Sequence, residues 1–279
     1  MSNSLVNMFK IEELRKKILW TFLFLVVFRI GAFIPIPGID PEVLKLYFLS
    51  QSNSSTIGLT EYLNFFAGGA FSNFSVFMLG IMPYISTQII FQLLMLVVPS
   101  LKKLTEDTAG RKKMQQYTRY GTIFVCLIQS YVVTVYANSI PDVMTLGVVP
   151  FTLIAMLSVT TGSMFLVWVG DQITARGVGN GISLLIFAGI VARIPDALVT
   201  LFRSVQAGTL NPIVVIVVFA MFAAVVALVV YEQRGQRKIP VQYAKRVVGR
   251  KMYGSQSTYI PFKINPSGVI PVIFASALL

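Results

Sequence analysis

The sequence predicts an all-α, polytopic membrane protein, a bundle of helices that cross the bilayer. Three observations support this fold class: 55% of the 279 residues are hydrophobic, only 12% are charged, and long apolar runs alternate with basic loops. Soluble domains contain about 25% charged residues, and one soluble core could not bury this much apolar surface. The excess is therefore expected to face lipid.

Six apolar runs are long enough to span a bilayer, since a helix needs about 20 mostly apolar residues to cross the hydrocarbon. We expect each to be a helix, because lipid leaves a chain without barrel-type alternation no other way to pair its backbone groups. The expected spans are 19–36, 75–98, 117–137, 151–170, 182–200 and 212–231, with a seventh that begins at Gly268 and is cut off at Leu279. The first lacks a small-x-small cleavage site and is interpreted as a retained span. The cut in the seventh predicts that part of the functional unit lies outside this sequence.

The distribution of lysine and arginine predicts the orientation of these spans. The basic stretches are the tail before residue 19, loop 99–116 and loop 232–267. The stretches poor in basic residues are 37–61, 138–150 and 201–211, which together hold only Lys45 and Arg203. This alternation places the N-terminus and loop 232–267 in the cytoplasm.

The composition also restricts the chemistry that the chain could perform. It contains one cysteine, Cys126, and no histidine, which excludes an internal disulfide and a Cys/His metal site. The commonest general base is therefore missing, and an enzyme would have to use Asp, Glu or Lys. No convincing acid–base pair is present, so we expect no catalytic residue, no metal and no cofactor.

Segment 61–74 is unusual for a lipid-facing helix. It is amphipathic, too short and polar to span, and runs directly into the second expected span. The pair Gly68-Gly69 would weaken a helix by roughly 1 kcal/mol per glycine. Two interpretations stay open: a half-helix that helps to build a pathway, or an interfacial helix on the outer leaflet.

The second expected span carries a proline and several polar residues. Pro83 is expected to break a backbone hydrogen bond and bend the helix in mid-span. The polar residues are Ser86, Thr87, Gln88 and Gln92. They indicate a face turned toward protein or water, although ordinary helix packing explains them as well. Ile81 and Ile85 share one face, because they are four residues apart.

The glycines in 171–183 invite a phosphate-loop interpretation. No strand precedes them and no Gly-Lys-Ser/Thr follows, so a nucleotide site is disfavoured. A tight cytoplasmic turn, with positive φ at a glycine, is the better prediction, and Asp171 and Arg176 are candidates for an ion pair across it. Arg29, inside the first span, either faces the bundle or extends toward the membrane surface.

Loop 232–267 predicts a cytoplasmic β-hairpin. Residues 239–244 and 258–264 alternate apolar and polar side chains, and glycines lie between them. Its tip, 245–251, is strongly basic. Such a tip can bind anionic lipid head groups or a phosphate-rich partner with a marked salt dependence.

Together these segments resemble the SecY family of protein-conducting channels, from about Lys10 to Leu279. The matching strings are 28–31 (Phe-Arg-Ile-Gly), 34–40 (Ile-Pro-Ile-Pro-Gly-Ile-Asp), 80–86, 116–121, 171–190, 232–237, 243–246 and 268–271. The resemblance implies a SecY-type helical bundle of ten spans in two inverted-repeat halves. Residues 1–205 would be the N-terminal half with spans one to five. Residues 206–279 would begin the C-terminal half with span six, the basic loop and part of span seven.

The resemblance also implies roles for particular residues. Segment 61–74 resembles the plug that closes the resting channel, including Tyr62, Leu63, Phe65, Phe66, Gly68, Gly69 and Phe71. The residues that resemble a pore ring are Ile81, Ile85, Ile186, Ile190 and Ile273. Those that resemble a partner-docking loop are Arg237, Lys238, Lys245, Arg246, Arg250 and Lys251. The second, third and seventh spans resemble parts of a lateral gate.

A member of this family is expected to be a non-enzymatic conduit in the bacterial plasma (inner) membrane, with its N-terminus in the cytoplasm. It would pass secretory proteins across the membrane and release membrane proteins laterally into it. The implied partners are SecE and SecG subunits, the SecA motor ATPase, the ribosome, the translocating polypeptide with its signal sequence, and membrane lipid, with SecDF and YidC as further candidates. The rival class is a secondary transporter, which predicts a polar site at mid-membrane, where Arg29 is the clear candidate.

Overall fold

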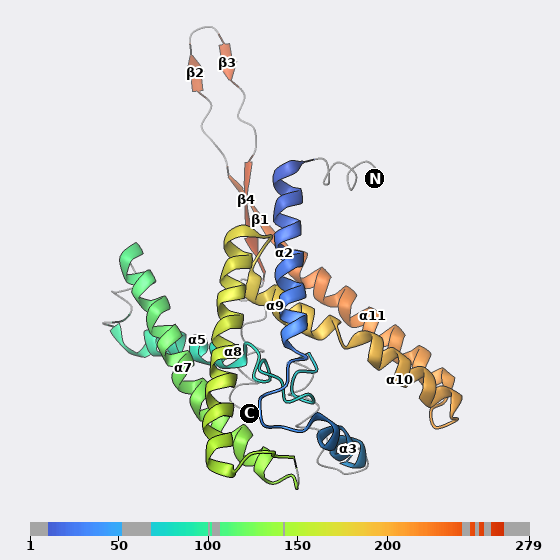
Figure 1. Ribbon diagram of the computed structural model, residues 1–279. Coiled ribbons are helices and arrows are strands. Elements are labelled where there is room, and N and C mark those ends of the chain that lie inside the picture. The colour runs from blue at the N-terminus through green and yellow to red at the C-terminus, as the bar shows by residue number, and fades with distance from the viewer. Residues whose placement is uncertain are drawn as a thin grey trace. The chain divides into compact units, whose positions relative to one another are not determined.

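The computed structural model describes residues 11–51, 68–99, 101, 107–141, 143–241, 246–248, 251–253 and 258–264 (Figure 1). The helices are α2 (Glu12–Gly31), α3 (Pro41–Gln51), α5 (Met82–Val97), α7 (Thr108–Asn138), α8 (Val148–Arg176), α9 (Gly181–Val191), α10 (Ile194–Gln206) and α11 (Pro212–Arg234). The strands are β1 (Gln236–Val241), β2 (Arg246–Val248), β3 (Lys251–Tyr253) and β4 (Thr258–Lys263). The mainly helical fold with a small hairpin is therefore confirmed.

The chain divides into two compact units, Met1–Leu198 and Val199–Leu279. The first contains the buried core, and the second contains the end of α10, all of α11 and the hairpin. This division follows packing, whereas the predicted halves 1–205 and 206–279 follow from an inverted repeat. Those halves remain a prediction.

Four helical runs in the described part of the chain are long and apolar enough to cross a membrane. They are α7, α8, the run Gly181–Gln206 that comprises α9 and α10, and α11. Each contains one of the last four complete spans expected from the sequence, apart from a break between α9 and α10. The expected seventh span, from Gly268, lies outside the described residues.

The first two expected spans are each wrong at one end. The first helix ends at Gly31, so residues 32–36 are not helical. Pro35 and Pro37 lack the N–H that a helix would use, and proline pushes the residue before it toward extended backbone. The helix of the second span begins only at Met82, so residues 75–81 are not helical either.

Helix α8 is central to the first unit. It packs against α2, α7 and α9, while α7 also packs against α5 (Figure 1). The side of α8 that is buried includes Gly162, Ser163 and Gly170. Small residues allow helix backbones to approach closely, which is how helices associate where lipid removes the hydrophobic driving force.

The buried face of α7 repeats mostly every fourth residue and is rich in small polar side chains. Its members are Gly110, Met114, Thr118, Thr122, Cys126, Ser130, Thr134 and Ala137. The hydroxyl of Thr118 donates to the Met114 carbonyl at 3.0 Å, and that of Thr122 donates to the Thr118 carbonyl at 2.7 Å. Because these two hydroxyls bond back into their own helix, they need no polar partners on a neighbouring helix.

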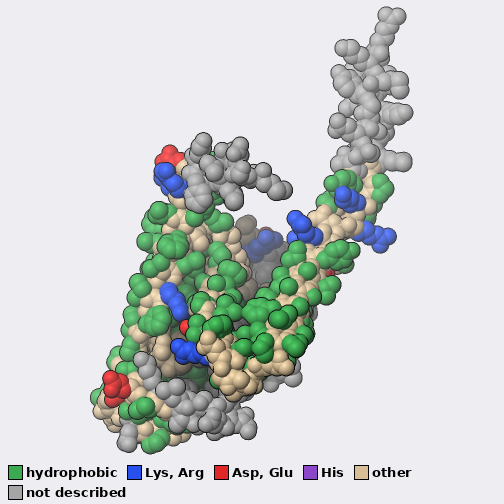
Figure 2. Space-filling model, turned by 90° about the vertical axis from the view of Figure 1, so that its right-hand side faces the viewer, with side chains coloured by type: hydrophobic (Ala, Val, Ile, Leu, Met, Phe, Trp, Pro, Cys, Tyr) green, Lys and Arg blue, Asp and Glu red, His purple; other side chains and the backbone are tan. Residues whose placement is uncertain are grey.

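In the second unit, α11 is apolar on every side and none of its residues is buried within the described structure. Its start is well defined: Asn211 Oδ1 accepts the Ile213 N–H at 3.0 Å, and Pro212 occupies the first turn. Figure 2 shows hydrophobic side chains over much of the described surface in view. A helix that is apolar all round is typical of a membrane span.

The predicted hairpin is present beyond α11. Strands β1 and β4 pair antiparallel, with Gln236 opposite Lys263 and Val241 opposite Thr258. Strands β2 and β3 form a second antiparallel pair farther along the hairpin. Because α11 continues to Arg234, the loop proper is shorter than the predicted 232–267.

Candidate functional site

A non-helical segment lies in the middle of the first unit. We call residues 68–81 the turn segment, because successive turns replace a helix there. Its buried hydrophobic residues are Ala70, Phe71, Phe74, Phe77, Met78 and Ile81. Irregular backbone at membrane depth is tolerated where protein buries it or where it lines a cavity. This segment is therefore the candidate functional site.

Arg29 of α2 contacts the first described residue of the turn segment. Its Nη1 donates a hydrogen bond to the Gly68 carbonyl at 2.8 Å. Its guanidinium carbon lies 5.0 Å from the centroid of the Phe33 ring. Of the two orientations that the sequence left open for Arg29, the structure shows the one that faces the bundle.

The extended chain after α2 pairs with the turn segment. The Ile36 N–H donates to the Phe74 carbonyl at 2.9 Å, and the Val76 N–H donates to the Ile34 carbonyl at 3.0 Å. These bonds flank an isolated antiparallel bridge between Pro35 and Ser75. The backbone groups that a helix would have satisfied internally are thus paired between two irregular segments.

Aromatic rings fix the turn segment against three helices. Phe77 stacks between Phe28 of α2 and Phe165 of α8, with ring centroids 6.4 and 6.0 Å away. Phe74 stacks on Tyr136 of α7, with centroids 6.4 Å apart and ring planes within 7°. Such pairs add specific geometry to the apolar area that they bury.

Two glycines on neighbouring helices admit the backbone of the segment. A Cβ on Gly162 of α8 would lie 2.2 Å from the Val76 carbonyl oxygen, closer than any real contact allows. A Cβ on Gly68 would lie 2.9 Å from the Cα of Gly189 in α9. The segment therefore touches α8 and α9 backbone to backbone, and no larger residue fits at these places.

The backbone of the segment is strained at one residue. Phe74 has φ +40°, a left-handed conformation that costs free energy for any residue with a Cβ. Its side chain is fully buried and its carbonyl is hydrogen-bonded to Ile36. Packing and pairing thus hold a conformation that the isolated chain would leave, a pattern found at functional sites.

Pro83 does not bend a helix in mid-span, contrary to the prediction. It lies in the first turn of α5, whose N-cap residue is Ile81. Proline fits there because the N–H that it lacks would have no partner inside the helix. The polar residues that follow are divided: Thr87 is buried and donates to the Pro83 carbonyl at 2.7 Å, whereas Gln88 is exposed.

Four of the five predicted ring residues are described, and Ile273 lies outside the described residues. Ile81 is buried in the core cluster, and Ile85 packs against that cluster one turn later. Ile186 and Ile190 lie one turn apart on α9, both partly buried. Gly189, the neighbour of Ile190, is the residue that Gly68 contacts. Whether the four side chains form one ring stays a prediction.

The predicted plug, 61–74, is described only from Gly68 onward. Tyr62, Leu63, Phe65 and Phe66 lie outside the described residues. Within the part described, Gly68, Gly69 and Phe71 belong to turns, so neither a half-helix nor an interfacial helix is present there. Gly68 and Gly69 have φ of +63° and +91°, which glycine adopts at little cost.

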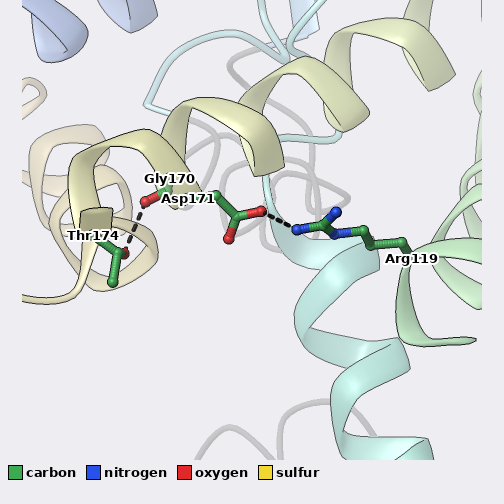
Figure 3. Close-up of polar contacts among 4 residues, drawn as sticks. All are labelled: Arg119, Gly170, Asp171 and Thr174. Atoms are coloured by element: carbon green, nitrogen blue, oxygen red, sulfur yellow. Dashed lines mark hydrogen bonds and ion pairs between the residues drawn. The ribbon is translucent and has the colours of Figure 1, made fainter. Parts of the chain in front are cut away.

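The turn between α8 and α9 is held by local hydrogen bonds. Gly179 has φ +74°, which confirms the predicted turn. Asn180 caps α9 by accepting the N–H groups of Ile182 and Ser183 through its side chain. The Thr174 hydroxyl donates to the Gly170 carbonyl at 2.9 Å (Figure 3). The same hydroxyl accepts the Gly181 N–H at 2.8 Å.

The predicted ion pair between Asp171 and Arg176 is wrong. α8 continues to Arg176, so both residues lie in its last turns and point to different neighbours. Asp171 pairs with Arg119 of α7, with 2.8 Å between Oδ2 and Nη2 (Figure 3). The guanidinium carbon of Arg176 instead lies 5.8 Å from the ring centroid of Trp20 on α2.

The predicted docking residues are distributed along the hairpin. Arg237 and Lys238 are exposed on β1, and Lys238 Nζ lies 4.7 Å from the centroid of the Tyr259 ring on β4. Arg246 is on β2 and Lys251 on β3. Lys245 and Arg250 lie outside the described residues.

Sequence reasoning missed several residues that build the site. Phe77 and Gly162 fall within expected apolar spans, and Phe74 is the last residue of segment 61–74; only the structure brings the three together. The signal that could have located the turn segment is the recurrence of glycine at 68, 69 and 80 across the start of an expected helix. That spacing argues against a continuous helix from 75.

Comparison with known proteins agrees with this architecture. The SecY family model matches residues 75–279. The SecY subunit of the protein translocase from Borreliella burgdorferi is 47% identical over 281 residues, covering 100% of this chain and 63% of its own length. The SecY subunit from Escherichia coli K12 is 47% identical over 271 residues, covering 96% of this chain and 60% of its own length. This chain therefore spans about three-fifths of the length of these two curated relatives.

Solved structures show the same fold. A protein-conducting channel superposes with a TM-score of 0.61 at 22% identity, over 95% of this chain and 56% of that one. A SecY protein whose plug domain is described as stabilising the closed channel superposes with a TM-score of 0.58 at 24% identity, again over 95% of this chain and 56% of that one. From the family match, the two sequence relatives and this shared fold, we conclude that the chain belongs to the SecY family.

Proposed function

We propose that this chain is the N-terminal portion of a protein-conducting channel subunit. The full-length protein passes secretory proteins across the plasma membrane and releases membrane proteins laterally into it. One observation carries the proposal: an irregular, glycine-rich segment is buried among helices of which several are long and apolar enough to cross a membrane, where lipid-facing backbone would have to be helical. Such a segment is expected where a membrane protein builds a pathway.

The pathway is closed by two elements in this proposal. The first is the plug, 61–74, whose described end is the start of the turn segment. The second is a ring formed by Ile81, Ile85, Ile186 and Ile190, completed by Ile273. Branched aliphatic side chains at a constriction exclude water and ions by dewetting. They have no fixed polar partners, so the ring yields to any polypeptide sequence.

The chain supplies no driving force in this proposal. It acts as a non-enzymatic conduit, and the energy comes from the SecA motor or from the translating ribosome, which dock on the basic hairpin. SecE and SecG complete the channel, SecDF and YidC are further candidate partners, and lipid surrounds α11. The excess of lysine and arginine in the N-terminal tail and the hairpin supports a cytoplasmic location for both, with the channel in the bacterial inner membrane. The second, third and seventh spans form part of a lateral gate.

A site-specific crosslinking experiment tests the channel. A photoreactive amino acid at Ile81 or Ile190 of the full-length protein is expected to crosslink an arrested secretory chain. The same probe at Leu157 on α8, which is 65% exposed, serves as a lipid-facing control and is expected to crosslink little. Equal labelling at all three positions would contradict a central pathway.

The same experiment separates the channel from a secondary transporter. A transporter requires a polar binding site at mid-membrane, and Arg29 is the candidate that the sequence offers. In the structure its guanidinium is already bonded to the Gly68 carbonyl. A photoreactive small solute that labelled the Ile81 and Ile190 neighbourhood, while an arrested chain did not, would favour the transporter.

A further inference from the structure

Arg29 is a charge placed near the end of an otherwise apolar stretch of α2. Arginine at membrane depth is costly and is expected to reach the interface or to find a partner. Arg29 takes no part in the ion pairs Lys16–Glu12 and Arg119–Asp171. Its guanidinium is instead satisfied by the Gly68 carbonyl, 2.8 Å away, and by the face of the Phe33 ring.

Gly68 contacts two different helices, α2 and α9. Its carbonyl accepts the Arg29 hydrogen bond, and its Cα lies against the backbone of Gly189 in α9. A Cβ at Gly68 would lie 2.9 Å from the Gly189 Cα and 3.2 Å from its carbonyl oxygen. The start of the turn segment is therefore clamped between a guanidinium on one helix and a glycine on another.

We infer that Arg29 is a positioning residue: its hydrogen bond to the Gly68 carbonyl holds the turn segment against Gly189 in the resting channel. We call this contact the latch. The inference rests on the proposed function for what the latched state does, namely to close the channel. The latch itself follows from the contacts alone. Arg29 lies outside the plug, and in this inference it helps to keep the plug in place.

The chemistry suits a latch that must also release. A hydrogen bond from a guanidinium to a carbonyl is charge-assisted and stronger than a neutral one. Because no carboxylate in the described part of the chain pairs with the guanidinium, water can replace the carbonyl once the segment moves away. The bond uses the backbone of Gly68, so it makes no demand on the side chains that pack elsewhere in the segment.

The test uses the full-length protein with its partner subunits, reconstituted in lipid. A cysteine reporter, Ser72→Cys, lies within the turn segment. Cys126→Ala removes the one cysteine of these 279 residues, and any cysteine elsewhere in the full-length protein or its partner subunits is replaced as well. Arg29→Met keeps much of the length and apolar character of the side chain but removes the donors. Modification of the reporter by a membrane-impermeant maleimide measures whether the turn segment has moved away from Gly189. Resting ion conductance in planar bilayers measures whether the channel has opened.

We expect Arg29→Met to raise both the modification rate and the resting conductance by roughly tenfold, the population change that matches loss of one charged hydrogen bond. Arg29→Lys, which retains a charged donor, is expected to fall between Met and the parent. Arg203→Met on α10 is the matched control, since Arg203 is exposed and distant in sequence from the segment. It should change neither reading.

A second pair of variants keeps the test decisive if Arg29→Met fails to assemble. Gly68→Ala and Gly69→Ala both place a Cβ at a positive φ, so both carry backbone strain. Only the first would press on Gly189, because a Cβ at Gly69 meets nothing within 4 Å. Gly68→Ala is expected to expose the reporter, and Gly69→Ala to leave it close to the parent.

The outcomes separate the latch from the channel. Increased modification in Arg29→Met and Gly68→Ala, with both controls unchanged, supports the latch whether or not conductance rises. Increased modification without any conductance would retain the latch and count against the closing role in the proposed function. Modification equal to the parent in an assembled Arg29→Met protein, or an equal increase in Arg203→Met or Gly69→Ala, would overturn the latch.

Discussion

Arg119 of α7 and Asp171 of α8 form an ion pair, 2.8 Å between Nη2 and Oδ2, across the interface between these two helices. Their side chains are 49% and 38% exposed, so water and salt screen the attraction. Exposed pairs of this kind contribute little stability. The pair is better understood as a specific contact between α7 and α8 than as a source of stability.

Breaking this pair is expected to have a small and salt-dependent effect. Arg119→Ala and Asp171→Ala should each lower the free energy of unfolding in detergent by about 0.5–1 kcal/mol, and the double variant by little more than either alone. A double-mutant cycle at low and high salt measures the coupling. Additive effects at both salt concentrations would show that the pair contributes nothing.

The Thr174 hydroxyl joins the end of α8 to the start of α9, because it donates to Gly170 and accepts from Gly181. Thr174→Val removes both bonds at nearly constant volume and leaves the Gly181 N–H without its partner. We expect a loss of about 1–3 kcal/mol and faster hydrogen exchange at the Gly181 amide. Thr174→Ser keeps the hydroxyl and is expected to preserve protection. Equal exchange in the Val and Ser variants would contradict the bridging role.

The sequence predicted the helices well where hydropathy and helix geometry agree. The spans that became α7, α8 and α11 are long, apolar and without internal proline, so the backbone has one favourable solution in lipid. The hairpin was also predictable, since the alternation in 239–244 and 258–264 has a period of two.

The turn segment could not be predicted for a physical reason. Residues 75–81 are as apolar as a span, and hydropathy does not distinguish side chains that face lipid from those that face protein. Their backbone partners are distant in sequence: the Ile34 carbonyl accepts the Val76 N–H, the Ile36 N–H donates to Phe74 just before them, and Gly162 admits the Val76 carbonyl. The Arg119–Asp171 pair was missed likewise, because its partners are 52 residues apart.

The junction between α8 and α9 offers a matched pair of glycine variants. A Cβ on Gly181 would lie 2.0 Å from the Gly170 carbonyl oxygen, whereas a Cβ on Gly179 meets nothing within 4 Å. Gly179→Ala carries only the strain of φ +74°, about 1 kcal/mol. Gly181→Ala must also push two backbones apart, an overpacking cost of about 1–3 kcal/mol or more.

Thermal unfolding of the two variants in detergent measures this difference. Gly181→Ala is expected to melt at a clearly lower temperature than Gly179→Ala, although both substitutions add the same methyl group within one short turn. Equal melting temperatures would mean that α8 and α9 separate without cost. The close approach at Gly170 would then have no part in holding the helices.

The basic hairpin provides the last prediction, which concerns partner docking. Its positive charges extend beyond the end of α11, and Lys238 and Arg237 are exposed on β1. A polyanionic partner such as the ribosome would gain affinity from these charges by releasing counterions. Reversal of Lys245, Arg246, Arg250 and Lys251 to Glu is therefore expected to weaken docking on the order of tenfold, with a shallower dependence on salt.

The four hairpin residues are chosen because their charge is not explained by orientation. The positive-inside rule requires basic residues near the membrane, but it does not require them at the tip of a hairpin. A control with two charges reversed, Lys112→Glu and Lys113→Glu on exposed positions of α7, is compared with Lys245→Glu and Arg246→Glu. Sedimentation binding to ribosomes at several salt concentrations reads out affinity, and protease protection reads out insertion of the spans. Docking that survives the four reversals, or that falls equally in the α7 control, would show that general charge rather than the hairpin recruits the partner.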